Sequence, residues 1–168
     1  MSINFLDETC QGQSNRKIFG LCDDPSPQQN PAYIDENDGS KWIAVVVNED
    51  KRLITFTAID HCITVLRADG KMAKRCDGML TYNNCVIFVE LKQRGSQGSG
   101  WVKDADDQLR TSISYFEGED EADNFTVKKA YISNSEHPKF KQSQLARMNQ
   151  FFNDTGYLLR IENRILVQ

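Results

Sequence analysis

Apolar residues along the chain gather in short runs that polar and glycine-containing segments separate. Runs of this length, rich in Val, Ile and Phe, predict strands. The predicted strands lie at residues 17–21, 42–47, 53–59, 75–80, 86–92, 125–132 and 157–167. After the fifth run the spacing changes, because apolar residues recur every three or four positions. This spacing predicts an amphipathic helix that packs on a sheet through Val102, Ala105, Leu109, Ile113 and Phe116.

A second helix is predicted before the last strand. Its apolar positions are Leu145, Met148, Phe151 and Phe152, and Gly156 marks its end. Strand, helix, strand, helix and strand therefore follow one another after the middle of the chain. This order predicts an α/β fold in which a mixed central β-sheet is flanked by α-helices. A chain of 168 residues suits one such domain.

The first forty residues differ in composition from the rest. Residues 23–40 are rich in Pro, Gln, Asn and acids, which predicts a loop. We expect residues 1–40 to form an acidic N-terminal extension that packs on the core, and residues 41–168 to form the main domain. The formal net charge of the chain is −4; residues 1–40 hold seven acids and two basic residues, which leaves +1 for the remainder.

Charged residues follow a buried run at one point in the chain. The apolar residues 86–89 lead directly into Glu90 and Lys92, while Asp77 stands on the preceding predicted strand. Because side chains alternate along a strand, Glu90 and Lys92 should project from the same face. Charges there are costly unless they are paired or bound to metal. Two carboxylates suffice for Mg²⁺ or Mn²⁺, and a neighbouring amine can orient water, so this set predicts metal-dependent phosphodiester hydrolysis.

These residues also resemble a known motif. Asp77, a strand turn at residues 82–84 and the Glu90-x-Lys92 strand are similar to the core motif of the PD-(D/E)xK nuclease superfamily, which has the restriction-endonuclease-like fold. Cys76 stands where that motif has its proline, a substitution that the superfamily tolerates. The resemblance covers residues 56–132 in detail and the rest of the chain only coarsely.

The resemblance implies a role for each residue of the motif. Asp77 and Glu90 would be the metal ligands, with Mg²⁺ or Mn²⁺ as the cofactor. Lys92 would orient the attacking water and stabilise the transition state. Gln108, on the predicted helix after the Glu-x-Lys strand, is similar to a glutamine that supports the active site in many members.

Further acids are candidates for the same site. Asp60, near the end of a predicted strand, is either a third metal ligand or a partner of one, and it is equally well explained as a simple turn residue. Many members of the superfamily also carry an early glutamate on an N-terminal helix. Glu8, Glu36 and Glu49 are the candidates for this residue in the present chain.

Basic residues surround the motif although the chain as a whole is acidic. Lys74 and Arg75 precede the motif aspartate, and Arg94 follows the motif lysine. We expect these three residues to contact nucleic-acid phosphates. Because the net charge is negative, we expect weak intrinsic affinity for DNA, which a partner protein or a homodimer would raise.

The cysteine content and the hydropathy of the chain bear on its location in the cell. The five cysteines lack Cys-x-x-Cys spacing, so reduced thiols are expected. A Cys-His hydrolase built from Cys62 or Cys76 with His137 has no local sequence signature. No apolar run approaches a membrane span and no signal peptide is evident at the N-terminus. These features predict a cytoplasmic protein that does not contact membranes.

The function that we expect from the sequence is a Mg²⁺- or Mn²⁺-dependent DNA nuclease. The resemblance favours an endonuclease that acts in restriction, phage defence, repair or mobile-element biology. An alternative is a non-catalytic protein of the same fold that serves as a binding or regulatory subunit. A third hypothesis is an unrelated α/β interaction domain in which the Glu-x-Lys pattern arose by chance.

Overall fold

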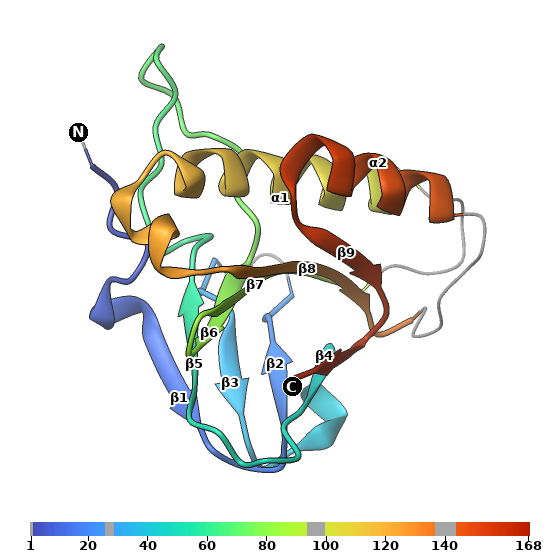
Figure 1. The fold of residues 1–168 in the computed structure, drawn as a ribbon. Coiled ribbons are helices and arrows are strands. Elements are labelled where there is room, and N and C mark those ends of the chain that lie inside the picture. The colour runs from blue at the N-terminus through green and yellow to red at the C-terminus, as the bar shows by residue number, and fades with distance from the viewer. Residues whose placement is uncertain (1, 26–28, 94–99, 137–143) are drawn as a thin grey trace.

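The computed structural model describes residues 2–25, 29–93, 100–136 and 144–168, and within these it has three layers (Figure 1). Two α-helices, α1 (Gly100–Glu117) and α2 (Leu145–Thr155), cover one face of a large mixed sheet. A smaller sheet covers the other face. The chain is therefore an α/β protein with a mixed central sheet, as predicted. The prediction that helices flank the sheet is correct for one face only.

The large sheet has strands in the spatial order β1-β5-β6-β7-β8-β9. Their bounds are β1 (Gln11–Ser14), β5 (Ile54–Ala58), β6 (Gly78–Tyr82), β7 (Cys85–Lys92), β8 (Val127–Asn134) and β9 (Leu158–Ile161). Neighbours from β1 to β7 are antiparallel, whereas β7, β8 and β9 are parallel. Parallel neighbours need crossover connections, and α1 and α2 provide them. The predicted order of strand, helix, strand, helix and strand is thus confirmed.

The small sheet has the spatial order β10-β4-β2-β3. Its strands are β10 (Arg164–Leu166), β4 (Ala44–Val47), β2 (Ile18–Cys22) and β3 (Tyr33–Asp35). Three short 3₁₀ helices complete the described elements: η1 (Glu8–Cys10), η2 (Gly39–Lys41) and η3 (Asp120–Asn124). One predicted strand, residues 157–167, is wrong as a single element, because the chain bends after β9 and its end crosses to the small sheet as β10, parallel to β4.

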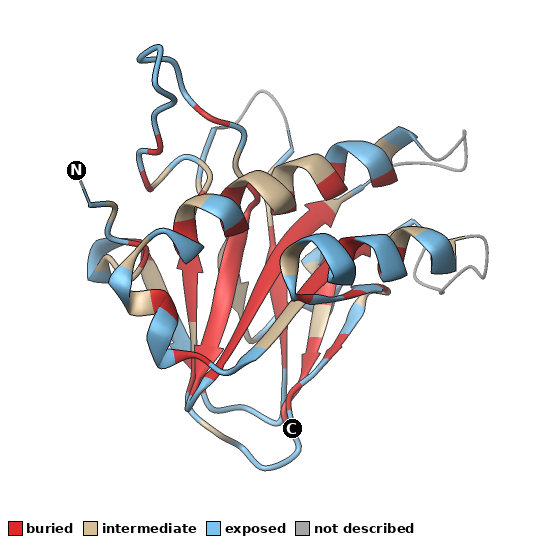
Figure 2. Ribbon diagram, turned by 45° about the horizontal axis from the view of Figure 1, so that its top comes forward, coloured by how far each residue is buried: buried red, intermediate tan, exposed pale blue. Residues whose placement is uncertain are grey.

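Strand β7 lies between two cores and is buried along almost its whole length. Val86 and Phe88 face the helices, whereas Ile87 and Val89 face the small sheet. The alternation follows from the pleat of the strand. Figure 2 shows the buried strands beneath helices whose outer surfaces are exposed. A buried run of apolar residues in the sequence therefore corresponds to a strand that is covered on both faces.

Residues 1–40 contribute to both layers of sheet. They provide β1 to the large sheet and both β2 and β3 to the small sheet. Phe5 is fully buried in the helix-side core, and Phe19 is fully buried between the sheets. The predicted loop at residues 23–40 misses β3, whose three half-buried residues pair with β2 at the edge of the small sheet.

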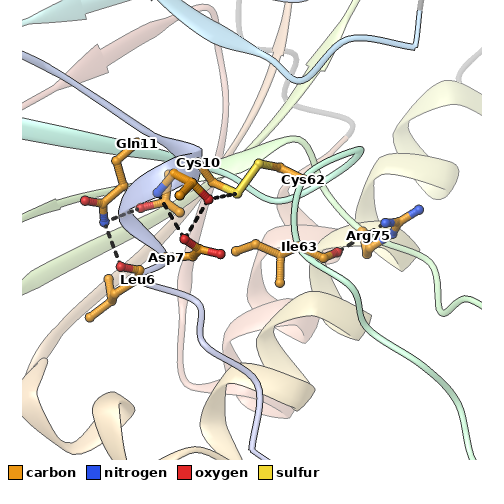
Figure 3. The surroundings of a disulfide bond; sticks show 9 residues. Leu6, Asp7, Cys10, Gln11, Cys62, Ile63 and Arg75 are labelled. Atoms are coloured by element: carbon orange, nitrogen blue, oxygen red, sulfur yellow. Dashed lines mark hydrogen bonds between the residues drawn. A yellow bond between two sulfur atoms is a disulfide. The ribbon is translucent and has the colours of Figure 1, made fainter.

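A disulfide joins Cys10 to Cys62 (Figure 3). The prediction that all five thiols are reduced is therefore wrong for this pair, while Cys22, Cys76 and Cys85 are free and buried. The two half-cystines are 52 residues apart in sequence, so their spacing gives no local signal. Disulfides are rare in the reducing cytosol, and this bond weighs against a cytoplasmic location. Among the described helices, none has the length and apolar character that a membrane span requires.

Candidate active site

The residues of the Asp-Glu-Lys motif meet at one end of the large sheet. Gly78 of β6 pairs with Val89 of β7, which places Asp77 beside Glu90. The Asp77 backbone N–H donates to Glu90 Oε1 over 3.0 Å, and the Leu91 N–H donates to Asp77 Oδ2 over 2.7 Å. Both residues are almost fully buried, with exposed fractions of 7% for Asp77 and 2% for Glu90. The two side chains therefore continue the hydrogen bonding of the strand pair beyond its last backbone bond.

Lys92 lies on the same face of β7 as Glu90, as the alternation predicts. Its Nζ is 3.0 Å from Glu90 Oε2 and donates to Gln108 Oε1 over 3.0 Å. The Gln108 amide in turn donates to the Arg75 carbonyl oxygen over 3.3 Å. Gln108 thus connects α1, the end of β7 and the segment before β6. It fixes the amine between a carboxylate and an amide oxygen.

Asp23 brings a third carboxyl group to the pair, and sequence reasoning missed it. It follows β2 of the small sheet, and its carboxyl group is hydrogen-bonded to that of Asp77. Its own pKa is raised, mainly by burial. The one available signal was its position directly after a buried strand. That signal was hidden because the neighbouring acids and prolines predict a loop.

The three glutamates considered for an early acidic residue lie elsewhere. Glu36 accepts a hydrogen bond from Ser14 and pairs with Arg16, and Glu49 pairs with Lys17 at 3.3 Å. Glu8 is exposed in η1. Among the described residues, the acid that the N-terminal region contributes to this site is therefore Asp23, which directly follows a strand.

The carboxyl cluster has an unusual electrostatic balance. Burial raises the pKa of Asp77 well above its ordinary value, and the charges of Glu90 and Asp23 raise it further. Burial also raises the pKa of Glu90, while Lys92 opposes that shift. Carboxyl groups this close cannot all ionise without a compensating positive charge. Among the described residues, Lys92 supplies the ammonium group in direct contact with this cluster, so full ionisation of the three acids would require a further positive charge.

Asp60 reaches the same region but is held by other partners. Its Oδ1 lies 3.2 Å from Arg75 Nη2, and its Oδ2 lies 3.3 Å from His61 Nε2. Arg75 also donates to the Ile63 carbonyl oxygen over 3.2 Å. The charges of Asp60 and His61 both act on Asp23, so this group of residues borders the cluster. Asp60 therefore stands as a partner of Arg75 at the edge of the site.

A cavity of about 390 Å³ opens beside the amine. Its lining residues come from the segment before β6, from β7 and from α1, and they are Asp60, Ala73, Lys74, Arg75, Lys92, Asp104 and Gln108. Two of the three residues predicted to contact phosphates, Lys74 and Arg75, thus lie at the cavity. The third, Arg94, lies outside the described residues. Two larger cavities, of about 640 and 490 Å³, lie next to the disulfide and away from the motif.

The acids touch one another and are not spread around a common point. Within the described ranges, no three His, Cys, Asp or Glu side chains are arranged so that they could hold a metal ion without rearrangement. Asp77 and Glu90 each use an oxygen to accept a backbone N–H. One oxygen of each of these two carboxyl groups is therefore engaged by the backbone.

A cysteine-dependent hydrolase finds little support. Cys62 is in the disulfide, and Cys76 is fully buried with a pKa raised by burial. A nucleophilic cysteine needs an accessible thiolate, which neither residue offers. His137 lies outside the described residues.

Comparisons with known proteins add no family to this description. No protein-family model, no curated protein and no solved structure shows a significant match to the chain.

Proposed function

We propose that this protein is a Mg²⁺- or Mn²⁺-dependent DNA endonuclease with a restriction-endonuclease-like core. The observation that carries the proposal is the contact of three carboxyl groups, from Asp23, Asp77 and Glu90, next to the Lys92 amine. Buried acids with no full complement of positive charge are expensive to keep in a fold. Such a cost is common at functional sites, and a divalent cation would remove it.

The donor set fits Mg²⁺ or Mn²⁺ by its chemistry. These ions prefer hard oxygen ligands and take one or two carboxylates, together with water and substrate phosphate. Asp77 and Glu90 are the proposed ligands, and Asp23 is an additional ligand or the acceptor of a metal-bound water. Asp60, which we considered as a ligand, is assigned to orienting Arg75. When bound, the cation would acidify water and neutralise charge on the phosphate oxygens.

Lys92 and Gln108 complete the proposed machinery. The ammonium of Lys92 is half-buried next to Glu90 and can donate to an attacking water or to a phosphate oxygen. Gln108 holds this amine and at the same time ties α1 to the backbone at Arg75. Lys74 and Arg75 at the cavity supply positive charge for the DNA backbone.

The topology also supports the proposed fold. The motif lies where an antiparallel strand pair meets the parallel half of a mixed sheet, with the first crossover helix carrying Gln108. Because the whole chain has a net charge of −4, we propose that a homodimer or a partner protein raises its affinity for DNA. Restriction, phage defence, repair and mobile-element biology are the settings proposed for this activity.

The decisive experiment is a cleavage assay with the purified chain. Supercoiled plasmid, linear duplex, single-stranded DNA and RNA are incubated with Mg²⁺, Mn²⁺ or EDTA. Cleavage of DNA that Glu90→Gln and Lys92→Ala each reduce by about a hundredfold or more would support the proposal. Glu49→Gln and Lys17→Ala are the matched controls, because this exposed ion pair lies apart from the motif. Equal cleavage by the site variants would show that a contaminant is responsible.

A second candidate, a non-catalytic binding or regulatory subunit, is favoured by one observation. The carboxylates of Asp77 and Glu90 already accept hydrogen bonds from backbone N–H groups. The described acids also form no preformed set of metal ligands. Calorimetric titration with Mn²⁺ separates the two candidates. A nuclease must bind the ion, and Asp77→Asn must abolish that binding. DNA binding without ion binding or cleavage would favour the subunit.

A further inference from the structure

Residues 65–75, which we name the arm, form a hairpin that projects from the body of the protein. Val65 and Ala73 are buried at its base, and all residues from 66 to 72 are exposed. Figure 1 shows this segment extending past α1, away from the sheets. An exposed hairpin of this kind contributes little to the core, so packing of the core does not explain why the chain forms it.

The arm has a defined internal structure. The Ala73 N–H donates to the Val65 carbonyl over 2.9 Å, and the Arg67 N–H donates to the Lys71 carbonyl over 2.8 Å. Gly70 has a φ of 84°, which turns the chain at the tip. Asp69 accepts both from Arg67 and from the Lys71 N–H. The arm is therefore a short two-stranded ribbon with a hydrogen-bonded tip.

Charge and apolar surface occur together on this ribbon. The arm holds four basic residues and one acid, a net +3, in a chain whose total is −4. Leu66 and Met72 face each other across the isolated bridge, and each is 46% exposed. Positive charge around a pair of exposed apolar side chains is the composition of proteins that enter a DNA groove and press apolar groups against the bases.

The base of the arm leads directly to the site. Ala73, Lys74 and Arg75 line the cavity beside Lys92, and Asp77 follows two residues later. A polymer whose phosphate lies in this cavity would extend along the arm. The major groove of duplex DNA admits a two-stranded ribbon.

We infer that the arm is a duplex-DNA-binding element that enters a groove next to the cleaved phosphate. The choice of ligand rests on the proposed nuclease function. Lys71 contacts the backbone phosphates, while Leu66 and Met72 contact the bases. The arm thus supplies local affinity that the acidic remainder of the chain lacks.

Binding is tested separately from cleavage. Fluorescence anisotropy with a labelled duplex in EDTA, on the Glu90→Gln background, measures affinity over a range of salt concentrations. Lys71→Ala should reduce the slope of log K against log salt by about one, with uniform weakening across sequences. Leu66→Ala with Met72→Ala should weaken binding severalfold without changing the slope. All three side chains are exposed, and circular dichroism checks that the variants remain folded.

Matched controls come from the opposite end of the sheet. Lys51→Ala and Leu53→Ala remove an exposed basic and an exposed apolar side chain of the turn before β5. Affinity loss in the arm variants but not in these controls would support the inference. Arm variants that bind like the controls, or a protein that binds no duplex even at low salt, would overturn it. Arm-dependent binding without cleavage in Mg²⁺ or Mn²⁺ would instead refute only the nuclease proposal.

Discussion

Asp23 and Asp77 flank strands of different sheets, and their carboxyl groups are hydrogen-bonded to each other. Asp23 follows β2 of the small sheet, while Asp77 precedes β6 of the large one. The same Asp77 carboxyl group is also hydrogen-bonded to Glu90. The packing of one sheet on the other therefore assembles an acidic cluster that neither sheet contains alone.

Asp77→Asn should stabilise the metal-free protein. An amide cannot ionise, so the variant needs neither a buried negative charge nor the uptake of a proton on folding, and its oxygen can still accept the Leu91 N–H. We expect the free energy of unfolding to rise by about 0.5–2 kcal/mol at pH 7.5 in EDTA, measured by urea denaturation. Asp60→Asn is the contrast, because it breaks contacts with Arg75 and His61 and should destabilise. A destabilised Asp77→Asn protein would mean that the charge is already compensated.

The stability of the metal-free protein should fall as the pH rises from 5 to 8. The folded pKa of Asp77 is above its ordinary value of 3.8, so the native state holds protons that the unfolded state has released. Each such group costs at most about 1.4 kcal/mol per pH unit until the pH passes its folded pKa. Urea midpoints across this range provide the test. Saturating Mg²⁺ should flatten the decline, and an equal slope with and without Mg²⁺ would contradict metal binding at this cluster.

Gln108→Ala should lower the rate of cleavage without loss of metal binding. The substitution removes the acceptor that holds Lys92 and frees the amine to move. A lost hydrogen bond of this type corresponds to a decrease of about tenfold in kcat, with little change in KM. Gln108→Glu keeps an oxygen for the amine and should restore part of the rate. Gln150→Ala, which removes an exposed helical hydrogen bond to Asp154, is the control.

Reduction of the disulfide should destabilise the fold. The bond between Cys10 and Cys62 closes a separation of 52 residues, which restricts the unfolded chain. We expect a loss of about 2–4 kcal/mol in the free energy of unfolding when reductant is added. The double variant Cys10→Ala with Cys62→Ala should show a similar loss and no further response to reductant. A thiol titration that finds five free cysteines in protein denatured without reductant would contradict the bond.

The sequence determined the local features of this protein. The period of the apolar residues predicted α1, α2 and most of the strands, because each period reports which faces of an element are covered. The alternation along β7 also placed Glu90 and Lys92 on one face, and the contact between them confirms it. Gln108 was predicted as a site residue from the resemblance to the nuclease motif, and its position on α1 lets it accept a hydrogen bond from Lys92.

Only the tertiary structure decided which distant segments meet. The joining of Asp23 to Asp77 and the division of residues 157–167 into β9 and β10 depend on the packing of one sheet on another. The disulfide depends on the pairing of β1 with β5 within the large sheet. Contacts of this kind bring together residues far apart in sequence, and no local period encodes them. For that reason the chain alone could predict the strand that carries the motif but not the full set of acids around it.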